Sequence, residues 1–284
     1  MSTSIINYNG ELIAESAFNL SANNRSFRYG DGLFESMRCE NGKILFWEDH
    51  YFRAMGSMCM LRMDIPSKLN MDYLHDLVLD TVKANGLSES SCRIRINFWR
   101  KDGGLYTPTN RSVNFLVECE ALDSVAFDIK QDGLSADIYF DHKKAKSDLS
   151  TIKSNNGILY VLASIFAEES DLDQVFIQNT DQHVIESQNS NLFVIKDNVI
   201  ITPDVKEGCL DGIMRKQILK IAEVLKIEVK NDPIRNYELS SADEIWVSNA
   251  VSGLQFVSKY KNKEYKASMM ETFVEELKQL AFNS

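Results

Sequence analysis

The chain has 284 residues, of which 44% are hydrophobic and 25% charged, and its formal net charge is -10. This composition is typical of a globular protein, and the acidic balance argues against a nucleic-acid surface, which would be basic. The first residues show no basic segment followed by an apolar one, and no apolar run reaches membrane-spanning length. We therefore expect a cytoplasmic protein that binds neither nucleic acid nor membrane.

The cysteines and histidines indicate neither a disulfide framework nor a metal site. The five cysteines are odd in number, widely spread and without a CxxC pair, and the four histidines have no metal-ligand spacing. Reduced thiols and the absence of a bound metal are the simplest expectation.

The first part of the chain predicts a mostly antiparallel sheet with two helices. Asn9-Gly10 and Asn41-Gly42 are strong hairpin signals, and Gly103-Gly104 separates two alternating segments. The predicted strands are residues 5–8, 11–13, 33–39, 43–47, 92–99 and 113–119. The predicted helices are residues 48–60 and 69–84. We expect residues 1–120 to form a small N-terminal domain and residues 121–124 to be a linker.

Residues 125–284 predict a second, larger domain. A hairpin is expected at Asp132-Gly133. The other predicted strands are residues 174–178, 184–187, 192–195, 199–202, 227–229, 245–248 and 254–260. The predicted helices are residues 158–166, 212–225 and 269–280.

Lys153 lies just ahead of the apolar helix predicted over residues 158–166. That helix places five apolar residues on one face, so we expect it to be anchored in a core, with the Ser/Asn run 154–156 as its cap. These residues are Ile158, Leu159, Leu162, Ile165 and Phe166. Burial lowers the pKa of an ammonium group, so a lysine held here could lose its proton and attack a carbonyl. When this segment is taken alone, a solvated lysine in a polar loop is the favoured interpretation, because lysine is rarely fully buried.

Two turns could bind a phosphate through main-chain groups. Gly212 precedes a helix, so the free N–H groups of Ile213 and Met214 could approach an anion at the helix N-terminus. Asn249-Ala250 belongs to a second turn of small residues that could present further N–H groups. An ordinary helix cap and a plain turn are the alternatives.

Several charged residues could recognise a ligand. Arg53 lies on the helix predicted over residues 48–60 and could bind a phosphate bidentately. Glu186 ends a strand and could keep a heterocyclic nitrogen protonated. Glu186 could equally be a charge on an edge strand. Arginines in or beside strands could bind a substrate carboxylate if they face a cleft, although strand arginines, like Arg53 taken alone, are more often solvated. These arginines are Arg38, Arg95 and Arg100.

The segment Arg25-Ser-Phe-Arg-Tyr-Gly-Asp-Gly-Leu-Phe-Glu35 resembles the opening motif of fold-type IV enzymes that use pyridoxal 5′-phosphate. That family includes branched-chain and D-amino-acid aminotransferases and 4-amino-4-deoxychorismate lyase. The resemblance continues in the family's order over nearly the whole chain, in residues 50–53, 153–156, 186–193, 202–203, 212–215 and 248–250. It implies an α+β fold with a small N-terminal α/β domain and a larger C-terminal domain that has a β-barrel-like sheet and flanking helices. It also implies a pyridoxal phosphate cofactor and a homodimer.

The resemblance also implies roles for individual residues. Lys153 is similar to the Schiff-base lysine, Glu186 to the partner of the pyridinium nitrogen, and Arg53 to the phosphate-binding arginine. The turn at Gly212, with the N–H groups of Ile213 and Met214, and the Asn249-Ala250 turn would assist with the phosphate. The residues on the substrate side would be Tyr29, Phe34 and one of Arg38, Arg95 and Arg100.

Three functions are compatible with these motifs. Phe34-Glu35 resembles the aminotransferases, and we favour a branched-chain-like amino-acid aminotransferase that transfers an amino group to a 2-oxo acid through an aldimine with Lys153. Met214 and Asn249-Ala250 are more similar to 4-amino-4-deoxychorismate lyase, which releases pyruvate and 4-aminobenzoate. A non-catalytic relative that binds a phosphorylated ligand is the least favoured, because both Lys153 and Glu186 are present.

Overall fold

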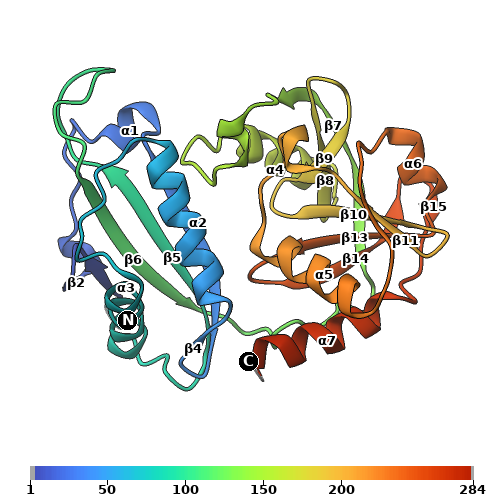
Figure 1. The fold of residues 1–284 in the computed structure, drawn as a ribbon, viewed down its shortest axis with the longest axis horizontal. Helices are drawn as coiled ribbons and strands as arrows, with labels where there is room; N and C mark the ends of the chain where they lie inside the picture. Colours follow the sequence, from blue (N-terminus) through green and yellow to red (C-terminus); the bar gives the residue numbers. More distant parts are fainter. Residues whose placement is uncertain (1–3, 283–284) are drawn as a thin grey trace. The chain divides into compact units, whose positions relative to one another are not determined.

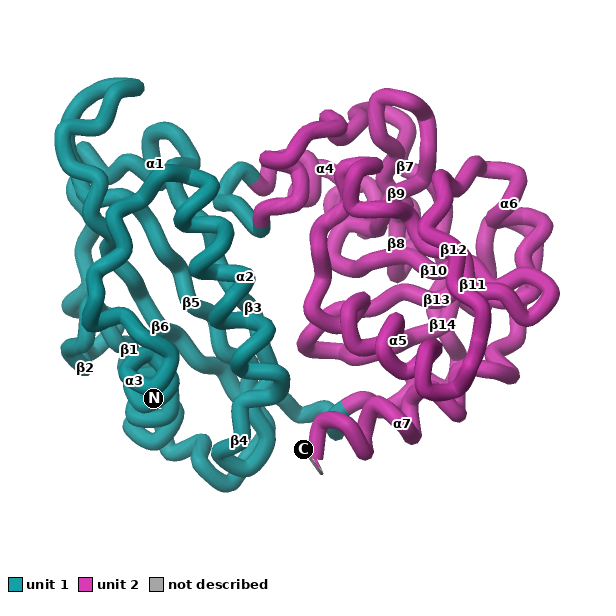
Figure 2. The backbone as a smooth tube through the Cα atoms, in the orientation of Figure 1, with its two compact units in different colours: residues 1–126, 153–156 teal, residues 127–152, 157–284 magenta. Residues whose placement is uncertain are grey.

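The computed structural model describes residues 4–282, which form two compact units (Figures 1 and 2). Unit 1 contains the residues up to 126 together with residues 153–156. Unit 2 contains residues 127–152 and those from 157 onwards. The segment that carries Lys153 therefore belongs to unit 1, although the chain on both sides of it belongs to unit 2.

Unit 1 is built on a six-stranded antiparallel sheet with the order β2-β1-β6-β5-β3-β4. The strands are β1 (Ile5–Tyr8), β2 (Glu11–Ala14), β3 (Gly32–Glu40), β4 (Lys43–Ile44), β5 (Ser91–Arg100) and β6 (Val113–Ala121). Both predicted Asn-Gly hairpins are present, because Asn9 and Asn41 adopt the left-handed conformation that such turns need.

Three helices complete unit 1 (Figure 1): α1 (Arg25–Tyr29), α2 (Trp47–Met60) and α3 (Met71–Ala84). A 3-10 turn, η1, covers Glu15–Ala17. Helix α2 packs on β3, and α3 packs on β1 and β6. The strand predicted over residues 43–47 was too long, because Phe46 has a φ of 57° that turns the chain out of the strand and Trp47 begins α2.

The two faces of the unit 1 sheet carry different side chains. Along β3, Leu33, Glu35 and Met37 are buried on the face that α2 covers, and Phe34 and Ser36 alternate onto the opposite face. That opposite face is polar on β5 and β6, where Arg95, Asn97 and Glu118 lie in register with β3. The polar face is the one that the Lys153 segment joins.

Unit 2 contains a nine-stranded sheet in which six strands close on themselves. The order β10-β13-β14-β7-β8-β9 returns to β10 through the pair Asn191 and Glu186, which makes a barrel. The strands are β7 (Leu134–Lys144), β8 (Gln174–Asn179), β9 (Val184–Ser187), β10 (Asn191–Lys196), β11 (Val199–Thr202), β12 (Val229–Asn231), β13 (Glu244–Asn249), β14 (Gly253–Tyr260) and β15 (Lys263–Glu264). One buried cluster draws side chains from all six strands of the ring, so the ring encloses a core.

Helices flank this barrel (Figure 1): α4 (Ile158–Glu169), α5 (Ile213–Val224), α6 (Asn236–Ser241) and α7 (Met270–Phe282), with 3-10 turns η2 (Asp148–Thr151) and η3 (Val205–Glu207). Helix α4 packs on β7 and β8 through Ala163 and Ala167. In contrast to the expectation, Ile158, Leu162 and Ile165 are exposed. The apolar face predicted for this helix is therefore only partly buried in unit 2.

The predicted hairpin at Asp132-Gly133 is wrong. Strand β7 follows Gly133 but pairs in parallel with β14 and β8, and the described residues 127–131 form no strand. Within residues 4–282, no helix is both long and apolar enough to cross a bilayer.

Candidate active site

Lys153 is fixed in register beside β3. The Phe34 amide donates to the Lys153 carbonyl at 2.9 Å, and the Asn155 amide donates to the Gly32 carbonyl at 3.0 Å. The Asn155 side chain also donates to the Ser26 hydroxyl, and the Asn156 side chain to the Gly30 carbonyl. The Ser/Asn run predicted to cap α4 therefore ties residues 153–156 to unit 1, and the N-cap of α4 is Gly157, without a side-chain cap.

Two cationic side chains lie close to the Phe34 ring. The Lys153 amine is 4.6 Å from the centre of the Phe34 ring, and the Arg95 guanidinium carbon is 3.7 Å from it. Arg95 donates through Nε to the Asn97 side chain at 3.2 Å, and its terminal nitrogens donate to no other residue among 4–282. The structure thus brings the predicted Schiff-base lysine, Lys153, together with two residues predicted for the substrate side, Phe34 and Arg95.

The other two candidate arginines are engaged within unit 1. Arg38 binds Glu40 and Ser124 at the far end of β3. Arg100 donates to Asp31 at 2.9 Å and to the carbonyls of Leu61 and Arg62 at 2.7 and 3.0 Å. Both guanidinium groups are buried with these partners.

Arg53 is held by a buried carboxylate that the sequence analysis gave no role. Arg53 donates to both oxygens of Glu35 at 2.8 and 2.6 Å, and the His50 ring nitrogen Nδ1 lies 2.7 Å from Glu35. Burial raises the pKa of Glu35, but the charge of Arg53 and the hydrogen bonds from His50 and Arg53 outweigh it and lower the pKa to about 2. Burial also lowers the pKa of His50. The pair of ionised groups fixes the orientation of Arg53 on α2.

Tyr29 ends α1 near the loop between β5 and β6. Its ring lies 5.4 Å from that of Tyr106 and 5.1 Å from the guanidinium carbon of Arg25. Arg25 is buried, donates to the carbonyls of Gly103 and Leu105 among others, and binds Asp31. Through these hydrogen bonds, Arg25 holds the loop between β5 and β6 in place.

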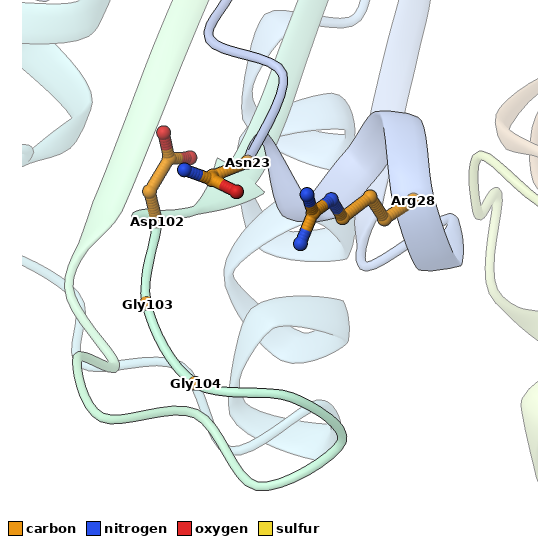
Figure 3. A pocket seen from close by; sticks show the side chains of 5 residues that line it. All are labelled: Asn23, Arg28, Asp102, Gly103 and Gly104. Carbon is orange, nitrogen blue, oxygen red and sulfur yellow. The ribbon is translucent and has the colours of Figure 1, made fainter.

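An open pocket of about 400 Å³ lies beside the same loop (Figure 3). It is lined by Asn23, Arg28, Asp102, Gly103 and Gly104. None of the residues predicted for the site lines it.

In unit 2, the Glu186 carboxylate accepts three hydrogen bonds. Lys144 and the hydroxyl of Tyr160 donate to one of its oxygens at 2.7 and 2.8 Å, and the Leu210 amide donates to the other at 2.7 Å. Burial and the adjacent Glu186 charge raise the pKa of Tyr160, so its hydroxyl stays protonated and remains a donor. Sequence reasoning missed Lys144 and Tyr160, because nothing in their local pattern distinguishes them from a strand-end lysine and a helical tyrosine.

The start of α5 presents free main-chain donors next to Glu186. Gly212 is the N-cap and supplies no side-chain cap, and the amides of Ile213 and Met214 donate to no atom of residues 4–282. A Cβ added at Gly212 would lie 1.8 Å from the Asn191 side-chain oxygen, so a larger residue would displace the Asn191 side chain or the turn. These orphan donors at a helix N-terminus fit a phosphate group.

The Asn249-Ala250 turn is ordered by its own side chain. Asn249 accepts from the amides of Val251 and Ser252 and donates to the Ser190 hydroxyl. The Ser248 hydroxyl is buried beside it without a hydrogen-bond partner in the described residues. Orphaned polar groups of this kind are what a bound polar group would satisfy.

A family model described as amino-transferase class IV matches residues 32–260. The chain belongs to the class IV aminotransferase family. It is therefore an enzyme, and the predicted family and the predicted cofactor, pyridoxal 5′-phosphate, are confirmed.

Curated relatives of this class IV aminotransferase carry different activities in their names. A putative branched-chain-amino-acid aminotransferase of Methanocaldococcus jannaschii is 28% identical over 86% of this chain and 83% of the relative. A D-alanine aminotransferase of Staphylococcus aureus is 29% identical over 85% and 83%. An aminodeoxychorismate lyase of Vibrio harveyi is 26% identical over 85% and 88%.

Solved structures share the fold. A branched-chain aminotransferase from Thermoproteus uzoniensis, crystallised with norvaline, superposes with a TM-score of 0.89 at 21% identity, covering 98% of this chain and 94% of that one. The Escherichia coli branched-chain amino acid aminotransferase gives 0.87 at 20% identity, over 100% and 96%. The predicted α+β, fold-type IV architecture with a barrel-like sheet is confirmed.

Proposed function

We propose that this enzyme is an amino-acid aminotransferase, acting on branched-chain-like amino acids, in which Lys153 is the Schiff-base lysine. The observation that carries the proposal is the arrangement around Phe34, where the Lys153 amine and an available guanidinium edge of Arg95 contact one ring. An α-amino acid carries an amine and a carboxylate a few ångströms apart. The two side chains offer a partner for each.

The residues that the family resemblance assigns to the cofactor are proposed to hold it. Arg53, kept in place by Glu35, and the amides of Ile213, Met214 and the Asn249-Ala250 turn would bind the phosphate. Glu186 would accept a hydrogen bond from the ring nitrogen, and Lys144 and Tyr160 keep that carboxylate oriented. Pyridoxal phosphate, when bound, supplies an electron sink for the carbanion that forms at the substrate Cα.

The protein's own part in the reaction is proton transfer and orientation. Lys153, as a neutral amine, would accept the proton from the substrate Cα. It would then deliver that proton to the aldehyde carbon of the cofactor. Arg95 would hold the substrate carboxylate, and Phe34 and Tyr29 would line the substrate side. We also propose a homodimer, as the family resemblance implies.

4-Amino-4-deoxychorismate lyase is the second candidate. The Vibrio harveyi relative carries that name, and Met214 is buried at the start of α5 without the hydroxyl that many transaminases have there. Loss of one hydroxyl costs on the order of 1 kcal/mol in phosphate binding, which is too little to decide the reaction.

Two assays on the same protein preparation separate the candidates. Consumption of an amino acid that depends on an added 2-oxo acid is the result expected of the transaminase. Release of pyruvate and 4-aminobenzoate from aminodeoxychorismate without any 2-oxo acid is the result expected of the lyase and would overturn the first proposal.

A further inference from the structure

Glu207 is a buried carboxylate close in sequence to the start of α5. It ends the short 3-10 turn η3, and the N-cap Gly212 follows five residues later. Its side chain is 11% exposed. A charge so largely removed from water needs partners, and the partners of Glu207 come from other segments of unit 2.

Three side chains bind the Glu207 carboxylate. One oxygen accepts from the Lys146 amine at 2.8 Å. The other oxygen accepts from the Asn179 side-chain nitrogen at 2.9 Å and lies 2.7 Å from the His183 ring nitrogen Nδ1. Burial raises the pKa of Glu207, but the hydrogen bonds from these three side chains outweigh it and lower the pKa. The carboxylate is therefore ionised at neutral pH.

Asn179 joins η3 to the turn between β8 and β9. Its side-chain nitrogen also donates to the main-chain carbonyl of Glu207 at 3.0 Å. Its side-chain oxygen accepts from the amides of Asp181 and His183, each at 3.0 Å. Because Asn179 is fully buried, these hydrogen bonds hold the β8–β9 turn and the end of η3 together away from water.

The segment 207–212 is attached to the barrel at a second point. The Leu210 amide donates to Glu186 at 2.7 Å, and the Leu210 carbonyl accepts from the Asn191 side chain at 2.8 Å. Between the two points, Gly208 has a φ of 94°, a conformation that favours glycine and turns the chain sharply. The segment is thus fixed at one end through Glu207 and in its middle through Leu210.

The position of this segment determines where the free amides of α5 point. Ile213 and Met214 directly follow Gly212, so their amides move with it. Hydrogen bonds weaken steeply as their length and angle leave the favourable range. A shift of the segment would therefore weaken the contacts of both amides with an anion without removing either donor.

We propose that Glu207 is a positioning residue for the phosphate of the cofactor. By holding η3 on the β8–β9 turn, it places the Ile213 and Met214 amides where the phosphate binds. This inference rests on the proposed function, in which those amides bind the phosphate. It holds equally for an aminotransferase and for a lyase.

The test compares two ligands that differ only in the phosphate, pyridoxamine 5′-phosphate and pyridoxamine. Both are titrated by calorimetry into the full chain freed of its cofactor. The wild type should bind the phosphorylated ligand at least about 100-fold more tightly. In Glu207→Ala this ratio of affinities should fall about tenfold or more, while the affinity for pyridoxamine changes less than about threefold. A general loosening of the fold would instead lower both affinities equally.

Glu207→Gln carries the same test if the alanine variant does not fold. It keeps the length of the side chain and one acceptor oxygen but loses the charge that attracts Lys146. The ratio of the two affinities should then fall about threefold or more.

The matched control is Asp181→Ala. Asp181 pairs with the same Lys146 amine, at 3.1 Å, but within the described chain its carboxylate accepts no hydrogen bond from residues 207–212. Its ratio should stay within about twofold of the wild type. The control also isolates the effect of charge, because each alanine variant takes one negative partner from Lys146. Charge alone would raise the affinity for phosphate in both variants.

Three results would overturn the role of Glu207. These are an unchanged ratio in Glu207→Ala, equal losses of affinity for the two ligands, and a ratio that rises in both alanine variants. If the wild type itself binds the two ligands equally, the proposed phosphate site fails and this inference fails with it. If the wild type prefers the phosphorylated ligand and Glu207→Ala keeps that preference, only the role of Glu207 fails.

Discussion

Arg95 differs from the other candidate arginines in what its terminal nitrogens contact. Those of Arg38 and Arg100 donate to hydroxyl or carbonyl oxygens, whereas those of Arg95 donate to nothing within the described chain. Sequence alternation could place all three arginines on strands. It could not tell which of them the fold would engage, because their partners come from distant segments.

Replacing Arg95 by Gln tests its proposed role. The variant loses a charge-assisted bidentate contact, so we expect KM for the amino acid to rise about 10- to 100-fold with a smaller change in kcat. Steady-state kinetics measure both. Arg93→Gln, on the same strand but exposed and paired with Glu120, is the control and should behave as wild type. Equal losses in the two variants would remove Arg95 from substrate binding.

At the scale of elements, local signals predicted most strands and helices, and non-local pairings were missed. Asn-Gly turns and the Gly212 turn depend on a few neighbouring residues, so they could be found from the sequence. The parallel pairing of β7 with β14 and the ring closure between β9 and β10 depend on segments far apart in the chain. Lys144 reaches Glu186 through the pairing of β7 with β8 and of β8 with β9, and Tyr160 reaches it from α4, which packs on β7 and β8.

Glu35 shows why a buried charge escapes prediction from sequence. A glutamate in an alternating strand is expected to be solvated. Here it faces α2, where Arg53 and His50 satisfy it. The signal that could have found it is the coincidence of an acidic residue on the apolar face of β3 with a nearby His-x-x-Arg helix.

The ion pair of Glu35 with Arg53 should make the free energy of unfolding depend on pH. The folded pKa of about 2 lies below the reference value of 4.5, so Glu35 stabilises the fold fully above pH 4.5 and loses this contribution as the pH falls towards 2. The lowered pKa of His50 acts in the same direction as the pH falls through 6.5. The free energy of unfolding of the wild type, measured with urea, should therefore fall by about 3 kcal/mol as Glu35 becomes protonated between pH 4.5 and pH 2.

Glu35→Gln is the matched variant for that measurement. It removes the negative charge that Arg53 pairs with, so we expect it to be less stable at pH 7 by about 3 kcal/mol. Its stability should also fall less steeply in acid. If the free energy of unfolding of the variant fell with decreasing pH as steeply as that of the wild type, other carboxylates would be the cause of the pH dependence.

Gly212→Ala tests the start of α5 as the phosphate site. The added methyl group meets the Asn191 side-chain oxygen, and Asn191 in turn donates to the Leu210 carbonyl, so we expect the turn and the Ile213 and Met214 amides to be displaced. We expect the dissociation constant for pyridoxal phosphate to rise at least about tenfold, as measured by fluorescence titration. Gly157→Ala at the N-cap of α4 is the control, because its added Cβ meets no atom within 4 Å. Unchanged cofactor affinity in Gly212→Ala would argue against this site.

At the scale of the whole molecule, the proposed homodimer predicts a particle of twice the chain mass of 32.4 kDa. The exposed apolar residues of α4, which the sequence placed in a core, need a cover in water. Sedimentation analysis should find the doubled mass at micromolar concentration. A particle with the mass of one chain would contradict the dimer.

The central claim is that Lys153 alone binds the cofactor covalently. Borohydride reduction of the enzyme with pyridoxal phosphate, followed by peptide mapping, measures this directly. The account predicts one reduced adduct, on the peptide that contains Lys153, and none in Lys153→Ala. An adduct on a different lysine, or no adduct in the wild type, would contradict it.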